Sequence, residues 1–196
     1  MRPRFVASLL LALATTAEAA PRPAPLPRVA INTSEGTIVV ELEAKRAPIS
    51  SANFLKYVDA HRFDGTYFYR AARAKSDPHR GLIQGGIDHD MPKTFFPIKH
   101  EPTSVTGLKH VDGTLSMARN DPGTAMGDFF ITIGPAAGLD AAPGYPGYAA
   151  FGHVVKGMDV AKRILAKPTY PGGYSFDTMG QTIRDRVKII TAVRIR

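Results

Sequence analysis

Apolar and polar residues alternate in two short runs where the globular part of the chain begins. Val29, Ile31 and Thr33 share one face of the first run, and a second run follows at residues 37–42. A period of two is typical of a half-buried strand. The segment Ser34-Glu35-Gly36 between the runs suits a tight turn, because glycine adopts turn conformations easily. The fold is therefore predicted to begin with a β-hairpin.

The next segment changes from the strand period to a helical one. Pro48 suits the first turn of a helix, and Ala52, Leu55 and Val58 then recur every three residues. This pattern predicts an amphipathic helix over residues 49–60 that lies on the sheet. A similar pattern predicts a second helix over residues 158–165.

The remaining apolar runs are short and are separated by segments rich in glycine and proline. They predict further strands at residues 66–70, 82–85, 114–118, 129–133, 149–155 and 186–196. About eight strands with two helices favour a mainly β fold, a closed eight-stranded antiparallel barrel capped by two α-helices. Long loops are expected at residues 71–80, 88–109, 134–148 and 167–180, and loops of this length usually carry function.

The first nineteen residues have the order of a secretory signal peptide. A basic start at Arg2 and Arg4 precedes an apolar run over residues 5–14, and Ala17-Glu18-Ala19 forms a cleavage site. The apolar run is too short for a membrane span, which needs about 20 residues. We therefore expect an exported protein without a stable membrane anchor, in a bacterial periplasm. Residues 20–27 are predicted to be an extended Pro-rich leader, and residues 28–196 the folded domain.

Composition narrows the possible chemistry. The chain has no cysteine, which excludes disulfides, thiol nucleophiles and cysteine-bound metals. Motifs for a serine-type triad, for nucleotide binding and for a zinc protease are absent, and the six histidines are scattered. The sequence therefore predicts neither a metal nor another cofactor.

The net charge is positive. Removal of residues 1–19 leaves 23 basic and 16 acidic residues, a surplus of seven positive charges. Several of the basic residues lie in the terminal strand without interleaved aromatic residues, which favours a solvated strand face over a nucleic-acid site. No nucleic-acid partner is expected.

Five short segments are more specific than any of these features because of their order. They are Phe68-Tyr69-Arg70, Leu82-Ile83-Gln84-Gly85-Gly86, Leu115-Ser116-Met117-Ala118, Gly127-Asp128-Phe129-Phe130-Ile131 and Phe151-Gly152. In this order they resemble the cyclophilin family of peptidyl-prolyl cis–trans isomerases, from about residue 29 to residue 195. The resemblance implies an eight-stranded barrel with two capping helices, a groove on its outer surface and proline-containing polypeptides as substrates.

The resemblance also implies which residues act on the substrate. The catalytic arginine of the family falls on Arg70, its groove glutamine on Gln84 and its backbone-contacting alanine on Ala118. Gln84 would orient Arg70 and contact the peptide.

The proline pocket of the family would be lined by three apolar side chains of this chain. Phe130 and Leu139 match the pocket phenylalanine and leucine, and Leu82 takes the place of a pocket methionine. Tyr148 is the best match for the groove histidine of the family, with Tyr145 as a competing candidate.

These residue types suit the rotation of an X-Pro bond. The barrier is about 18–20 kcal/mol because rotation removes amide resonance. In the twisted transition state the proline nitrogen regains its lone pair and accepts a hydrogen bond. An arginine aimed at that nitrogen stabilises this state selectively, without a covalent step.

The sequence departs from the family at several groove positions. Gly81 stands where an aromatic residue is common, Arg119 where the family has asparagine and Asp128 where it has glutamine. The last two replace neutral groups with opposite charges, and we therefore expect an ion pair across the groove floor that changes the preference for the residue before proline. Thirteen residues separate Arg70 from Gln84, and residues 140–151 are also longer than is typical, so two loop insertions are expected beside the groove.

These departures leave alternatives open. The first prediction is an exported, monomeric isomerase. The second is a non-catalytic peptide-binding or chaperone module on the same barrel, and the third is a basic module that binds nucleic acid or an anionic envelope polymer.

Overall fold

The structure is a computed structural model, and it describes residues 25–88, 90–173 and 175–196. The predicted signal peptide at residues 1–19 and most of the predicted leader lie outside the described residues. Among the helices in the described ranges, none has the length and apolar character needed to cross a membrane.

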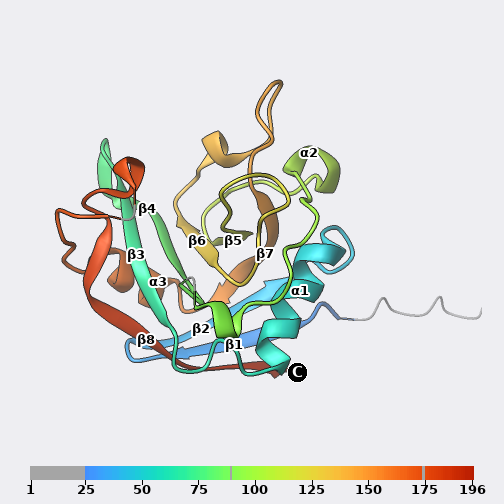
Figure 1. Cartoon of the computed structure of the whole chain (residues 1–196), viewed down its shortest axis with the longest axis horizontal. Coiled ribbons are helices and arrows are strands. Elements are labelled where there is room, and N and C mark those ends of the chain that lie inside the picture. Colours follow the sequence, from blue (N-terminus) through green and yellow to red (C-terminus); the bar gives the residue numbers. More distant parts are fainter. Residues whose placement is uncertain (1–24, 89, 174) are drawn as a thin grey trace, which may run out of the picture.

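Eight antiparallel strands form a closed barrel, as the sequence predicted (Figure 1). Around the barrel they run in the order β1-β2-β7-β5-β6-β4-β3-β8, and β8 closes it by pairing with β1. Their bounds are β1 Arg28–Thr33, β2 Gly36–Leu42, β3 Tyr67–Ala74, β4 Asp77–Gly86, β5 Thr114–Met117, β6 Phe129–Ile133, β7 Ala149–Lys156 and β8 Thr182–Ile195.

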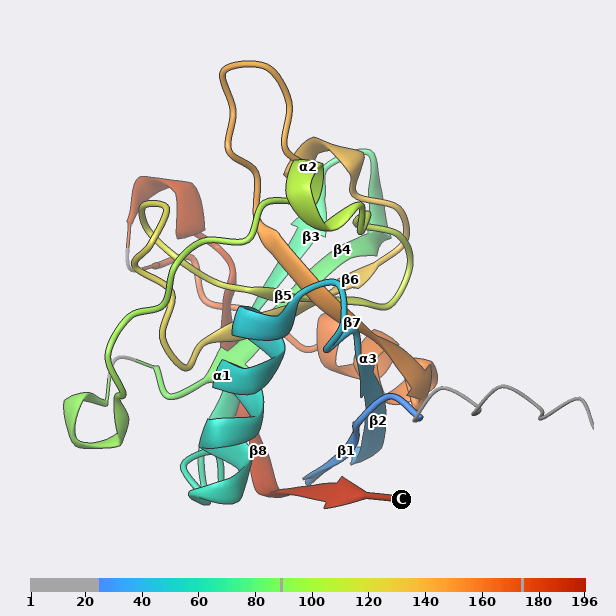
Figure 2. The same cartoon turned by 90° about the vertical axis from the view of Figure 1, so that its right-hand side faces the viewer.

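Two longer helices cap the barrel on opposite sides (Figure 2). Helix α1 spans Pro48–Asp59 and α3 spans Met158–Leu165, within one residue of the prediction at each end. A four-residue helix, α2 at Thr103–Thr106, and three short 3-10 helices at Met91–Lys93, Ala137–Leu139 and Phe176–Thr178 lie in the connecting loops. The two-helix cap is confirmed.

The barrel interior is a single apolar core with aromatic rings at its centre. Phe54 of α1 packs edge-on against Phe129 of β6, with ring centroids 5.2 Å apart, and Phe68 of β3 packs against the same ring at 5.7 Å. Each of these side chains is at most 1% exposed. Burial of a large aromatic side chain contributes about 1.5–3 kcal/mol, so these rings fix α1 against the barrel.

The N-terminus of α1 is capped by a distant carboxylate. Ala47 at the N-cap offers no side-chain hydrogen bond, but Glu101 accepts the backbone N–H groups of Ile49 at 3.0 Å and Ser50 at 2.6 Å. Glu101 is 8% exposed. A carboxylate at this helix end satisfies unpaired donors and complements the helix dipole. The long segment between β4 and β5 is therefore tied to α1.

The prediction of a loop at residues 71–80 is wrong. These residues extend β3 and β4 into a longer hairpin, in which Ala72 pairs with Leu82 and Ala74 with Asp77. Most side chains of this extension are exposed or half-buried, so its strands lack the apolar alternation that predicts strands from sequence. The extra residues between Arg70 and Gln84 are thus strand and not loop.

Gly81 pairs with Arg73 in this extended hairpin, beside an irregularity in the strand register. Its φ is 146°, and a Cβ atom at this position would lie 2.0 Å from the carbonyl oxygen of Ala72. Any side chain here would force the two strands apart. The absence of an aromatic residue at Gly81 is therefore a requirement of this hairpin.

Candidate active site on the outer face of the barrel

The predicted catalytic residues lie in one row across the outside of the sheet. Arg70 of β3 pairs in register with Gln84 of β4, Gln84 pairs with Phe130 of β6, and Phe130 pairs with Ser116 of β5. Neighbouring residues in such a row point to the same face. A cation, an amide and an aromatic ring that are distant in sequence therefore stand side by side.

The guanidinium of Arg70 is held by two amide side chains. Its Nη1 donates to Oε1 of Gln84 at 2.8 Å, and its Nε donates to Oε1 of Gln181 at 2.8 Å. Gln181 immediately precedes β8, and Arg70 pairs with Thr182 of that strand. Two acceptors on different N–H groups fix the plane of a guanidinium. The proximity of Gln84 and Arg70 agrees with the predicted orienting role.

A hydroxyl and a carboxylate stand behind Gln84. The amide Nε2 of Gln84 donates to the Tyr69 hydroxyl at 2.7 Å, and that hydroxyl donates to Oδ1 of Asp128 at 3.0 Å. Tyr69 is 2% exposed. Burial, together with the negative charge and hydrogen bond of Asp128, raises the pKa of Tyr69 far above its ordinary value. The hydroxyl is therefore protonated at every physiological pH.

Phe130 forms an aromatic cluster with two other rings. Tyr148 lies edge-on against it, with centroids 5.5 Å apart and an interplanar angle of 86°, and His110 lies nearly parallel to it on another side. Phe130 is 2% exposed but does not belong to the core cluster inside the barrel. Its burial comes from the loop residues that cover the outer face.

His110 links this ring cluster to the loop that follows β6. Its Nδ1 lies 2.7 Å from Oδ1 of Asp140, and its Nε2 lies 3.0 Å from the hydroxyl of Ser116. Burial lowers the pKa of His110, against the opposing effect of Asp140. Burial also disfavours ionisation of Asp140, but hydrogen bonds from His110 and the charge of Lys109 outweigh it and hold the pKa of Asp140 below its usual value.

The other predicted substrate-contacting residues border this row. Leu82 lies two residues from Gln84 on β4 and is half-buried. Leu139 ends a 3-10 helix, and its carbonyl accepts the backbone N–H of Tyr148 at 2.9 Å. The backbone N–H of Ala118 donates to the carbonyl of Asp128 at 3.0 Å. Leu139 is thus connected to Phe130 by Tyr148, which binds the Leu139 carbonyl and packs against the Phe130 ring.

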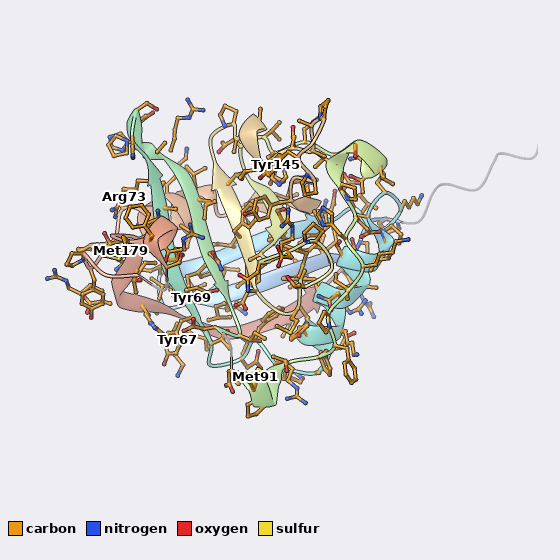
Figure 3. The ribbon with its side chains drawn as sticks, turned by 45° about the horizontal axis from the view of Figure 1, so that its top comes forward. Tyr67, Tyr69, Arg73, Met91, Tyr145 and Met179 are labelled. Atoms are coloured by element: carbon orange, nitrogen blue, oxygen red, sulfur yellow. The ribbon has the colours of Figure 1, made fainter. Side chains whose placement is uncertain are left out.

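The structure separates the two tyrosine candidates. Tyr148 packs against Phe130, whereas Tyr145 lies in the tip of the loop before β7, where its backbone pairs with Ala142 and its side chain is 39% exposed. This loop projects from the barrel in Figures 1 and 2, and Figure 3 places Tyr145 there, well apart from Tyr69. Tyr148 is therefore the residue of the two that contacts Phe130.

The prediction of an ion pair between Arg119 and Asp128 is wrong. Asp128 accepts the Tyr69 hydroxyl and the backbone N–H of Asp88, the latter at 2.9 Å. The Arg119 guanidinium donates instead to the carbonyls of Asn120 and Gly147 and lies 4.6 Å from the ring centroid of Tyr148. The two charges therefore act at different places, Asp128 behind Gln84 and Arg119 at the loop that carries Tyr148.

Sequence reasoning missed three residues of the site. Tyr69 was part of a recognised segment but received no role, and His110 was one of several scattered histidines. Gln181 lay between the loop predicted at residues 167–180 and the strand predicted at residues 186–196. Their partners are distant in sequence, 111 residues in the case of Arg70 and Gln181. The only local signal was the position of Tyr69 directly before Arg70.

The described residues contain no group of three or more metal-binding side chains.

The comparisons with known proteins agree with this geometry. The sequence profile of the family described as cyclophilin type peptidyl-prolyl cis-trans isomerase/CLD matches residues 28–193. A peptidyl-prolyl cis-trans isomerase of Acinetobacter baylyi is 36% identical over 159 residues, which cover 80% of this chain and 81% of that protein. Peptidyl-prolyl cis-trans isomerase cyp18 of Streptomyces antibioticus is 41% identical over 148 residues, covering 72% and 84% of the two chains.

A solved structure shares the fold. The cyclophilin type peptidyl-prolyl cis-trans isomerase of Cryptosporidium parvum, crystallised in the presence of the dipeptide Ala-Pro, superposes with a TM-score of 0.69 at 23% identity. The match covers 86% of this chain and 99% of that one.

The closed barrel, its two capping helices and the outer row of arginine, glutamine and phenylalanine define a cyclophilin fold. The chain belongs to the family of cyclophilin-type peptidyl-prolyl cis-trans isomerases. It is a peptidyl-prolyl isomerase.

Proposed function

We propose that Arg70 is the catalytic residue of this isomerase and that the substrate proline binds beside Phe130. The observation that carries the proposal is the row across the sheet. It places Arg70 of β3, whose guanidinium Gln84 and Gln181 hold, and Phe130 of β6 on either side of Gln84 of β4. The pyrrolidine ring would rest among Phe130, Leu82 and Leu139, and Tyr148 would border the groove.

The chemistry requires selective stabilisation of the twisted amide. In the planar ground state the proline nitrogen has no lone pair to offer, and at the transition state it does. Arg70 then donates a charge-assisted hydrogen bond that exists only in that state, which is what lowers a barrier. Because Gln84 and Gln181 already hold the guanidinium, little reorganisation is needed when the bond turns.

The substrates we propose are X-Pro segments of unfolded or exposed polypeptides, bound by a monomer in the periplasm after export. The order of charge, apolar run and small residues at positions 1–19 supports export. Expression of the full chain in a bacterium, followed by fractionation and N-terminal sequencing, tests this. A periplasmic product that begins at Ala20 is expected, and a cytoplasmic product that keeps residues 1–19 would contradict export.

The catalytic assignment is tested by Arg70→Ala in a cis-to-trans assay on a proline tetrapeptide. The mutant is expected to lose about 100-fold or more in kcat/KM, because one charge-assisted bond to the transition state is removed. Arg163→Ala is the matched control, since Arg163 is exposed on α3 and pairs with Asp159. An Arg70→Ala protein with wild-type activity would overturn the assignment, and an inert wild type that still binds peptide would favour the non-catalytic module.

A further inference from the structure

We infer that Tyr69 and Asp128 are positioning residues that set the orientation of the Gln84 amide and, through it, of Arg70. The inference rests on the proposed function, because it assumes that Arg70 is the catalytic group. It goes further in assigning a role to two residues that do not touch the substrate in the proposed site, one of which, Asp128, was expected to form an ion pair instead.

The four side chains form one hydrogen-bonded chain with a fixed direction. Arg70 donates to Gln84, Gln84 donates to Tyr69, and Tyr69 donates to Asp128, at distances of 2.8, 2.7 and 3.0 Å. The two ends set this direction by their chemistry: a guanidinium only donates, and an ionised carboxylate only accepts.

The primary amide in the middle is the element with two possible states. The carboxamide of Gln84 can present either its oxygen or its NH₂ group to Arg70, and the wrong choice places two donors face to face. The Tyr69 hydroxyl excludes that choice as long as its single proton is used elsewhere, because its oxygen then accepts from the NH₂ group. Asp128 takes that proton.

The surroundings keep the Tyr69 hydroxyl in this state. Tyr69 and Asp128 are 2% and 9% exposed, so water competes weakly for either group. Oδ1 of Asp128 is itself located by the backbone N–H of Asp88, and Oδ2 of Asp88 is paired with Nη1 of Arg186 at 2.7 Å. Oδ1 of Asp128 therefore has a fixed position. The Tyr69 hydroxyl that it orients contacts Gln84, which is part of the row with Arg70.

The required feature is an acceptor at the position of Oδ1 and not a negative charge. An asparagine at position 128 can present its amide oxygen to both Tyr69 and the Asp88 N–H, whereas alanine offers nothing. Without an acceptor the hydroxyl can turn toward Gln84, the amide can flip and Arg70 loses one of the partners that hold its plane.

Four variants test the inference through kcat and KM measured separately on the proline tetrapeptide. Tyr69→Phe and Asp128→Ala are each expected to lower kcat about fivefold to tenfold with KM within twofold of wild type, the effect of losing one orienting hydrogen bond. Asp128→Asn is expected to stay within twofold of wild type. The double variant Tyr69→Phe/Asp128→Ala is expected to fall no further than Tyr69→Phe alone, because both residues act through the same bond.

Controls separate positioning from unfolding and from a general charge effect. Each variant's thermal midpoint and peptide-binding stoichiometry report the folded fraction, and rates are referred to that fraction. Asp159→Asn removes an exposed carboxylate of α3 that pairs with Arg163 and takes no part in the hydrogen-bonded chain, and it is expected to leave kcat unchanged.

The outcomes distinguish the inference from the proposed function. If Arg70→Ala abolishes turnover but Tyr69→Phe and Asp128→Ala keep the kcat of wild type, the inference is overturned while the catalytic assignment stands. If Asp128→Asn falls as far as Asp128→Ala, charge and not hydrogen-bond direction is responsible, and the inference is also overturned. An unchanged rate in Arg70→Ala overturns both.

Discussion

The imidazole of His110 lies almost parallel to the ring of Phe130, with centroids 5.9 Å apart and an interplanar angle of 14°. The aromatic wall of the proposed proline pocket therefore rests on a group that can titrate. The same imidazole contacts Asp140, the residue after Leu139. Phe130 and Leu139, which come from different elements, are thus connected through one buried side chain.

This arrangement predicts that the protein loses stability on mild acidification. Burial lowers the pKa of His110 in the folded state, whereas in the unfolded chain it returns to about 6.5. The unfolded state therefore binds more protons as the pH falls below about 6.5, and the free energy of unfolding decreases until the pH passes the folded pKa. A single group contributes at most about 1.4 kcal/mol per pH unit in this window.

The measurement is urea unfolding at pH 7 and pH 5, compared with His110→Gln. The variant keeps hydrogen-bonding capacity but cannot take up the proton, so its stability is expected to change less between the two pH values. Asp140 does not interfere between pH 7 and pH 5. Its pKa is lowered in the folded state, so its contribution to the free energy of unfolding is lost only as the pH falls below about 4. An identical loss in wild type and His110→Gln would show that His110 is not the responsible group.

We predict that any side chain at position 81 destabilises the β3–β4 hairpin. Gly81→Ala places a Cβ atom against the Ala72 carbonyl at a φ of 146°, so both strain and a backbone clash oppose it. We expect a loss of about 2 kcal/mol or more in the free energy of unfolding. Gly138→Ala is the matched control, since no atom lies within 4 Å of its Cβ position and its φ is not in the left-handed region.

Chemical denaturation of the two glycine variants decides this prediction. Gly138→Ala is expected to be neutral or slightly stabilising, because alanine reduces the entropy of the unfolded chain. Equal stabilities of the Gly81 and Gly138 variants would mean that the hairpin accommodates a Cβ atom at position 81 without cost.

The fold was predictable because its signals are local. The helix that begins at Pro48 and the alternation from Val29 to Thr33 each report on neighbours a few residues away. The extended hairpin was missed for the same reason: most side chains of residues 72–80 are exposed or half-buried, so their pairing leaves no alternating pattern of apolar residues. These strands are held by backbone pairing and by Arg73, which donates to the carbonyls of Leu165 and Lys167, and neither contact produces an apolar pattern in the sequence.

The sequence identified those residues of the candidate site that lie in segments resembling the family. It did not identify the contacts between side chains that are distant in sequence. Arg70, Gln84 and Phe130 were identified from ordered segments, and the strand register places them in one row. The opposite charges of Arg119 and Asp128 suggested a pair, but charge alone does not bring side chains together. The partners that each residue found, a tyrosine hydroxyl and two loop carbonyls, follow from packing that the sequence does not display.

We predict that substitution of Arg119 weakens peptide binding but leaves kcat nearly unchanged. Its guanidinium binds the carbonyl of Gly147 and stacks on Tyr148, so it holds the segment that brings Tyr148 to Phe130. Arg119→Met keeps the apolar stem but removes these contacts. The peptide Kd is expected to rise about threefold to tenfold, on the scale of one or two such contacts, while kcat changes little because the Arg70 row is untouched.

The stability of this variant provides an independent check. Nε of Arg119 is buried without a hydrogen-bond partner, so its removal recovers part of the free energy lost with the other contacts. The free energy of unfolding is therefore expected to change by less than about 1 kcal/mol. Arg119→Lys keeps a cation near Tyr148 but lacks the planar fork that contacts both carbonyls, and an intermediate Kd is expected. Calorimetric titration with a proline peptide gives the Kd of both variants, and the cis-to-trans assay gives their kcat. A fall in kcat at unchanged Kd would place Arg119 in the reaction instead of in the groove wall.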